Sequence, residues 1–270
     1  MTQSTVADSA WLICADCLEY MSHIPSQSID LILTDPPYGT SASSWDKVIP
    51  IGKLWEHYKR IIKPNRAIVM FAQQPFTSLL VCSNLKMYKY NWVWQKDNGT
   101  NFLNSHHQPL KISEDICVFS TGSASPSKRG GGSMIYNPQF EQGKPYTCVS
   151  GKQKSDSAVV SKNRDGKVDS VEGFLTVNTG VRYPRNIIKF NRDKEKLHST
   201  QKPVALLEYL IKTYSNEGDV VLDSCMGSGS TGVAALNTSR SFIGIENNEG
   251  IYNIAYERIK KKFKGGGVLN

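Results

Sequence analysis

The chain has 270 residues, of which 39% are hydrophobic and 21% are charged, as in an ordinary soluble protein with one large domain and an insert, or with two small domains. No stretch approaches the roughly 18 apolar residues of a membrane span, and no basic-then-apolar signal opens the chain, so we expect a cytoplasmic protein without a membrane partner. The CxxC formed by Cys14 and Cys17 has no second pair at metal-binding spacing, so we expect neither a metal nor a disulfide framework.

The net charge of +8 is concentrated in one segment. Residues 1–120 carry 10 basic and 10 acidic side chains, residues 201–270 carry 8 and 7, and residues 121–200 carry 14 and 7. A local basic excess is what a polyanion-binding surface needs, because each phosphate contact displaces a counterion. On charge alone, a solvated lysine-rich loop explains the segment equally well.

Alternating strands and helices are predicted before this segment. Strands are expected at 11–16, 28–35, 66–72, 88–96 and 113–121, and helices at 50–63 and 75–85. Such alternation is typical of a mostly parallel, doubly wound α/β sheet. From residue 122 to about 182 the periodicity fails, which predicts mobile loops or a small insert that orders on a partner.

Regular structure returns with an amphipathic helix at 202–215, followed by a strand, a glycine turn and a helix. The turn "GSGSTG" (227–232) matches G-x-G-x-x-G, and Glu246 ends the next expected strand. Glycines let a ligand approach the backbone, and an acid at that place can accept both hydroxyls of a ribose. The pattern predicts a nucleoside-containing cofactor, either a dinucleotide or S-adenosylmethionine. Asp223 favours the latter, because a carboxylate would attract its ammonium group and repel a pyrophosphate.

The strand expected at 28–35 ends in Asp35-Pro36-Pro37-Tyr38. The two prolines stiffen the turn and lack N–H groups, which favours free, outward-facing carbonyl acceptors. Asp35 adds a carboxylate acceptor and Tyr38 a flat ring. Two acceptors beside a stacking ring form a receptor for the exocyclic amino group of a base. If this strand neighbours the one before Gly227, both motifs face one crevice at the carboxyl edge of the sheet.

This receptor suits methylation of an amine such as adenine N6. Its lone pair is delocalised into the ring, and two acceptors on its hydrogens would draw the nitrogen toward tetrahedral geometry. A sulfonium methyl held in line then needs only positioning and electrostatics. A base within a duplex must first flip out, and Tyr38 can stack on it.

Together these strings resemble the amino-methyltransferases of DNA. "DPPY" resembles their catalytic motif, "DSCMGSG" their cofactor loop, and "HSTQKPVALLEYLI" the segment before that loop. The order of catalytic motif, basic segment and cofactor loop is that of the β class. The resemblance implies a circularly permuted, Rossmann-like methyltransferase sheet with a basic irregular insert. It divides the chain into a catalytic part (1–121), a target-recognition insert (122–185) and an S-adenosylmethionine-binding part (186–270).

The resemblance also implies roles for individual residues. Asp35 and the Pro36 carbonyl would bind the target amino group, with Pro37 fixing the turn and Tyr38 stacking on the base. The cofactor would be held by a set that also includes Asp35: Asp16, Cys17, Thr200, Lys202, Asp223, Cys225, Gly227, Gly229, Glu246 and Asn247. The family often has Phe where this chain has Cys225. Double-stranded DNA would be contacted by Trp45, Lys128, Arg129, Arg182 and Arg185. Members are often homodimers.

Other interpretations remain open. Cytosine N4 needs the same acceptors as adenine N6, although Asp before Pro-Pro-Tyr favours adenine. A nicotinamide-dependent dehydrogenase would explain the glycine loop and Glu246 but neither "DPPY" nor "HSTQKP". A protein glutamine methyltransferase usually carries Asn before Pro-Pro-Tyr and places it after the glycine loop. A DNA-binding protein without activity is a further alternative, although no motif residue is visibly lost.

Overall fold

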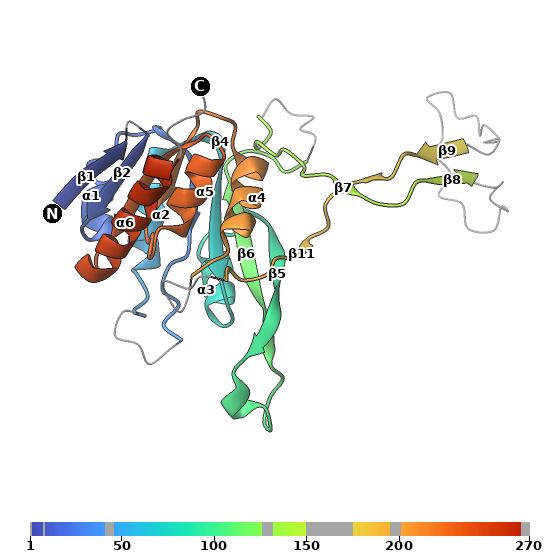
Figure 1. Cartoon of the computed structure of the whole chain (residues 1–270), viewed down its shortest axis with the longest axis horizontal. Coiled ribbons are helices and arrows are strands. Elements are labelled where there is room, and N and C mark those ends of the chain that lie inside the picture. Colours follow the sequence, from blue (N-terminus) through green and yellow to red (C-terminus); the bar gives the residue numbers. More distant parts are fainter. Residues whose placement is uncertain are drawn as a thin grey trace. The chain divides into compact units, whose positions relative to one another are not determined.

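The computed structural model describes residues 2–7, 9–40, 46–125, 132–149, 175–194 and 201–265. The chain divides into two compact units, one formed by Met1–Asn137 with Arg185–Asn270 and one by Pro138–Pro184 (Figure 1). Within the described residues, no helix is both long enough and apolar enough to cross a membrane.

The first unit contains a sheet whose nine described strands are ordered β1-β2-β13-β12-β3-β4-β6-β5-β11. Their bounds in this order are Thr2–Ala7, Ala10–Cys14, Ser241–Glu246, Val220–Asp223, Ile29–Thr34, Ile62–Ala72, Lys111–Ser120, Tyr88–Thr100 and Ile187–Lys189. Pairing is parallel except where β1 meets β2 and where β6 meets both of its neighbours. The expected mostly parallel, doubly wound architecture is confirmed.

Helices cover both faces of this sheet (Figure 1). Those packed on one face are α4 (Val204–Tyr214), α5 (Ser230–Asn237) and α6 (Glu249–Gly265). Those on the other are α1 (Cys17–Met21), α2 (Ile51–Ile61) and α3 (Phe76–Ser83). Along β4, Val69 and Phe71 belong to the first core while Ile68 and Met70 belong to the second, because successive side chains of a strand point to opposite faces.

The connections place a crevice between β3 and β12. These two strands are parallel neighbours, as Val221 pairs with Leu31 and Leu222 with Ile32. The chain leaves β12 toward β13 and leaves β3 toward β4, so the order reverses between them, and ligands bind at such a point beyond the carboxyl ends. The two motif-bearing strands are therefore neighbours, which is the condition under which both motifs face one crevice. β13 also pairs in parallel with β2, so a late strand of the chain lies beside an early one, as in a circularly permuted sheet.

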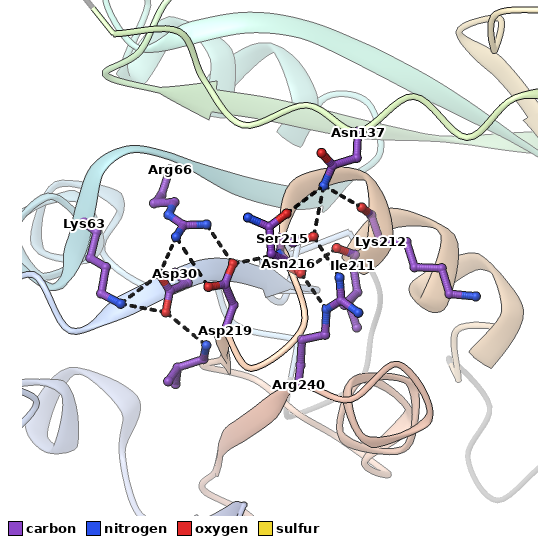
Figure 2. Close-up of polar contacts among 11 residues, drawn as sticks. Asp30, Lys63, Arg66, Asn137, Ile211, Lys212, Ser215, Asn216, Asp219 and Arg240 are labelled. Atoms are coloured by element: carbon purple, nitrogen blue, oxygen red, sulfur yellow. Dashed lines mark hydrogen bonds and ion pairs between the residues drawn. The ribbon is translucent and has the colours of Figure 1, made fainter.

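The opposite, amino-terminal edge is held by ion pairs centred on Asp30 (Figure 2). This carboxylate is 2% exposed and lies 2.8 Å from Lys63 Nζ and 2.9 Å from an Arg66 nitrogen. Arg66 also lies 2.7 Å from Asp219, and the backbone N–H of Val220 donates to Asp30. The cluster therefore joins the starts of β3, β4 and β12.

Asn137 ends the first stretch of the larger unit. Its side-chain amide donates to the carbonyls of Lys212 and Ser215 and to the side chain of Asn216 (Figure 2). These groups lie at or just beyond the end of α4. Asn137 therefore anchors the chain to α4 before the smaller unit begins.

Short antiparallel pairs make up the described part of the smaller unit. β7 (Glu141–Gln142) pairs with β10 (Val181–Arg182), and β8 (Tyr146–Val149) pairs with β9 (Leu175–Asn178). The Arg182 guanidinium lies 4.9 Å from the centre of the Tyr146 ring and donates 2.7 Å to the Lys144 carbonyl. These strands were not predicted, because none is long enough to show an apolar period.

Candidate active site

The carboxyl edge of the sheet carries a cavity of about 940 Å³. It is lined by the loops after β2, β3, β12 and β13, by Lys202 before α4, and by the stem of the β5–β6 hairpin. The predicted residues that it brings together are Asp16, Cys17, Asp35, Pro36, Pro37, Tyr38, Lys202, Asp223, Cys225, Gly227, Glu246 and Asn247.

Asp35 follows β3 directly and presents its carboxylate to this cavity. The Tyr38 hydroxyl donates to one oxygen and the Lys202 ammonium to the other. The side chain is 25% exposed, yet loss of hydration raises the pKa of Asp35, with Lys202 opposing this effect and the Glu114 charge adding to it. Each carboxylate oxygen has a second lone pair, so the group can still accept a hydrogen bond from a ligand.

The loop after Asp35 is clamped by Asp46, a residue that the sequence did not reveal as part of the site. One oxygen of its carboxylate accepts from the N–H groups of Tyr38 (2.7 Å) and Gly39 (2.8 Å), and the other from Thr40 (2.8 Å). Asp46 lies further along the same loop, and no periodicity or motif marks it. Its clamp satisfies three backbone donors and fixes the loop.

Glu114 is a second site residue that was not predicted from the sequence. It forms an ion pair with Lys202, which in turn pairs with Asp35. Lys202 Nζ lies 3.4 Å from Glu114, and Glu114 also pairs with Lys96 on the opposite strand of the β5–β6 hairpin. Burial disfavours the charged form of each group, but the two ammonium groups outweigh it and lower the pKa of Glu114. The two carboxylates likewise outweigh burial and raise the pKa of Lys202. Lys202 is therefore a fixed cation beside Asp35.

Asp223 ends β12 as a buried carboxylate. It accepts hydrogen bonds from the hydroxyls of Thr34 (2.8 Å) and Thr231 (2.6 Å) and from the N–H of Cys225 (3.1 Å). Burial nevertheless raises the pKa of Asp223 to about 6, against the lowering effect of these donors. Asp223 holds the start of the glycine loop to β3 and α5 and also borders the cavity.

The glycine loop itself is open toward the cavity at Gly227. Its φ of +51° suits glycine, and a Cβ there would meet no atom within 4 Å. Glu246, at the end of β13, accepts from the N–H of Gly227 (3.1 Å) and of Asn248 (2.9 Å). Asp16 caps α1 by accepting from the N–H groups of Leu18 and Glu19. The two acids are thereby fixed at neighbouring strand ends, and both line the cavity.

Comparison with known proteins agrees with this geometry. The family model described as DNA methylase (N6/N4) matches residues 29–257. The chain belongs to the DNA methylase family. The match runs from the start of β3 into α6 and so includes both the Asp35 loop and the glycine loop.

Individual relatives of this methylase share less than a third of its sequence, although they align with most of the chain. Type II methyltransferase M.HpaI of Haemophilus parainfluenzae is 28% identical, over 94% of this chain and 75% of its own. The DNA adenine methyltransferase YhdJ of Escherichia coli K12 is also 28% identical, over 92% of this chain and 82% of its own. Among solved structures, the M1.HpyAVI–SAM complex has a TM-score of 0.60 at 22% identity, covering 92% of this chain and 99% of that one. The cytosine-N4-specific PvuII DNA methyltransferase has a TM-score of 0.62 at 13% identity, covering 96% and 92%.

Several predicted residues lie elsewhere in the methylase. Gly229 does not line the cavity, and its missing side chain lets α6 approach, since a Cβ would lie 3.1 Å from Ala255 and Ile259. Arg182 belongs to the smaller unit, and Arg185 is exposed in the larger one. The predicted residues outside the described ranges are Trp45, Lys128, Arg129 and Thr200.

The aromatic and sulfur groups near the site are placed as follows. The Tyr38 ring stacks on Phe76, with centroids 5.3 Å apart. Trp92 and Trp94 are buried packing residues, and Trp94 also borders the cavity. A hydrogen bond with the Cys17 side chain and burial raise the pKa of Cys225, so this thiol is an uncharged packing group where the family often has Phe.

Proposed function

We propose that this methylase transfers a methyl group from S-adenosylmethionine to the N6 amino group of adenine in DNA, with the base flipped out of the duplex. The observation that carries the proposal is one cavity in which the Asp35-Pro-Pro-Tyr loop faces the glycine loop between Asp223 and Glu246. One loop supplies acceptors for an amine, and the other is suited to a nucleoside cofactor with a positive charge.

The cavity residues fit S-adenosylmethionine. Asp223 is a buried carboxylate that can face an ammonium group, and Gly227 leaves open space where a side chain would stand. Glu246 presents a carboxylate to the cavity, a hydrogen-bond acceptor of the kind that ribose hydroxyls need, and Lys202 offers a cation to a carboxylate. When bound, the cofactor supplies an electrophilic sulfonium methyl.

The Asp35 loop suits the target amine. Asp35 can accept one amino hydrogen, and none of the described residues donates a hydrogen bond to the Pro36 carbonyl, which leaves it for the other. Such acceptors localise the nitrogen lone pair and orient it, so positioning and electrostatics supply the catalysis. The methylated nitrogen must lose one proton. Asp35, with its raised pKa and partial exposure, is suited to take that proton and pass it to solvent.

The preference for adenine over cytosine rests on the residue before Pro-Pro-Tyr, Asp35, and not on the fold. The PvuII enzyme is named as cytosine-N4-specific and shares the architecture, so the fold serves both bases. YhdJ is named as an adenine methyltransferase, and Asp35 before Pro-Pro-Tyr resembles the adenine form of the motif. M.HpaI is named as a Type II methyltransferase, and a modification role of that kind fits this chain as well.

The test is methyl transfer from isotopically labelled S-adenosylmethionine to DNA from a methylation-free host. Digestion to nucleosides and mass spectrometry should show labelled N6-methyldeoxyadenosine with the wild type. Asp35→Asn, which keeps the shape but removes the charge, should lower the rate at least about 100-fold, as the loss of a preorganised electrostatic group does. Labelled N4-methyldeoxycytidine would establish the cytosine alternative, and no labelled base, or an unimpaired Asp35→Asn, would overturn the proposal.

A further inference from the structure

The β5–β6 hairpin extends beyond the sheet (Figure 1). Residues 102–113 are all exposed, and a short 3-10 helix, Phe102–Asn104, stands at the turn. We refer to residues 101–110 as the hairpin tip. Because β5 runs antiparallel to β6, and β6 antiparallel to β4, the end of β5 lies at the same edge of the sheet as the ends of β3 and β4. The tip therefore projects on the side where the cavity opens.

The tip exposes more apolar surface than a solvated turn requires. Leu103 is 97% exposed and Phe102 is 64% exposed, with Leu110 and Ile112 exposed close by. Single exposed apolar residues are ordinary, but a cluster of this kind marks an interaction site. The polar residues around it are asparagines, histidines, a threonine, a serine, a glutamine and a lysine, and residues 98–111 contain no acid. This composition suits a polyanionic partner.

The stem that carries the tip is rigidly braced and forms a wall of the cavity. Trp94, Lys96 and Thr100 of β5 and Glu114 of β6 all line it. The Lys96–Glu114 ion pair joins the two strands. Arg192, which follows β11, lies 3.7 Å from Asp97 and donates to the carbonyl of Asn98. The stem thus fixes the tip relative to Asp35.

We propose that the hairpin tip inserts Phe102 and Leu103 into the DNA duplex beside the target base and fills the space that the flipped base leaves. This rests on the proposed function, since only an enzyme that acts on a base needs to take it out of the stack. Flipping costs unstacking and unpairing, and apolar side chains inserted at a base step offset that cost in proteins that unstack DNA. The tip has the apolar pair, the acid-free surroundings and the fixed position that this task requires.

The test compares two duplexes that carry the recognition site, identified by sequencing of methylated DNA. In one the target base is normally paired, and in the other it faces an abasic site, so that little flipping cost remains. The double variant Phe102→Ala/Leu103→Ala should lose about 10- to 100-fold in kcat/KM on the paired duplex, and stay within about threefold of the wild type on the abasic one. Leu103→Ala alone should show a smaller loss of the same kind.

Leu79→Ala is the matched control, because Leu79 is 60% exposed on α3 and does not line the cavity. It should leave both rates unchanged, and titration with S-adenosylmethionine should be the same for all variants. Equal losses on both duplexes, or no loss on either, would overturn the inference. So would a change from dimer to monomer in light scattering, which would make the tip a subunit contact. A wild type that methylates neither duplex would contradict the proposed function itself.

Discussion

Asp223 shows how burial and hydrogen bonding compete at one residue. Two threonine hydroxyls and one backbone N–H stabilise its charged form, but the loss of hydration is the larger effect and its pKa is raised to about 6. A carboxyl group with a raised pKa in the folded state binds its proton more tightly there than in the unfolded chain. Its contribution to stability is therefore fully present below about pH 4 and is lost as the pH rises through 6.

This predicts a pH-dependent difference between the wild type and Asp223→Asn, whose amide does not titrate. A pKa of about 6 against an ordinary 3.8 corresponds to roughly 3 kcal/mol. The free energy of unfolding of the wild type, relative to that of the variant, should fall by about this amount between pH 4 and pH 7. Urea denaturation at several pH values measures it. Taking the difference cancels the titration of the other carboxyl groups, and a constant difference would rule out the raised pKa.

The site residues that could be predicted from the sequence are those that belong to short, recognisable motifs. Asp35 stands beside two prolines and a tyrosine, and Gly227 opens a recognisable glycine pattern. Asp46 and Glu114 have no such neighbours. They reach the site through the fold, Asp46 by folding back on the amides of the Asp35 loop and Glu114 by strand pairing with the β5 stem. Side chains of this kind become visible only when the tertiary structure is known.

At the level of elements, apolar strands were predictable and polar extensions were not. β3, β4 and β12 are buried, and their runs of Ile, Leu and Val mark them clearly. The edge strand β1 and the three-residue β11 carry little apolar periodicity. The outer part of the β5–β6 hairpin also has no buried face, so the sequence predicted its strands only at 88–96 and 113–121. An apolar period arises where one face of a strand is buried, and these strand segments have little buried surface.

The ion-pair cluster at the amino ends of β3, β4 and β12 should contribute to stability without serving the cavity. Asp30→Asn would leave Arg66 and Lys63 without their shared buried partner, and removing one member of a buried pair costs about 3 kcal/mol. Urea denaturation should show this loss, while S-adenosylmethionine affinity stays unchanged in the native range. Lys63→Ala is the control. Its side chain is 39% exposed, so its removal should cost less than about 1 kcal/mol. Equal losses for both variants would contradict the central role of Asp30.

At the scale of the molecule, the catalytic motifs and the basic excess lie in different parts of the chain. The lysines and arginines from Lys128 to Lys167 fall mostly outside the described residues, and none of the described residues that line the cavity belongs to this segment. Lys144, which is described, belongs to the smaller unit. We expect this basic segment to bind DNA phosphates rather than the cofactor, because its charge is high and its sequence shows no apolar period that would bury a face.

A variant with every lysine and arginine from Lys128 to Lys167 changed to glutamine should therefore bind DNA more weakly, most clearly at low salt. The slope of log affinity against log salt should flatten by about 0.9 for each phosphate that the variant no longer neutralises. S-adenosylmethionine affinity and the free energy of unfolding should match the wild type. Changing Lys260, Lys261 and Lys262 to glutamine is the control, since these residues lie near the end of α6, and Lys260 already pairs with Glu257. Fluorescence anisotropy with a labelled duplex at several salt concentrations gives both the DNA affinity and the slope. If the basic variant keeps the wild-type affinity and slope, the segment is a solvated loop and the phosphates are bound elsewhere.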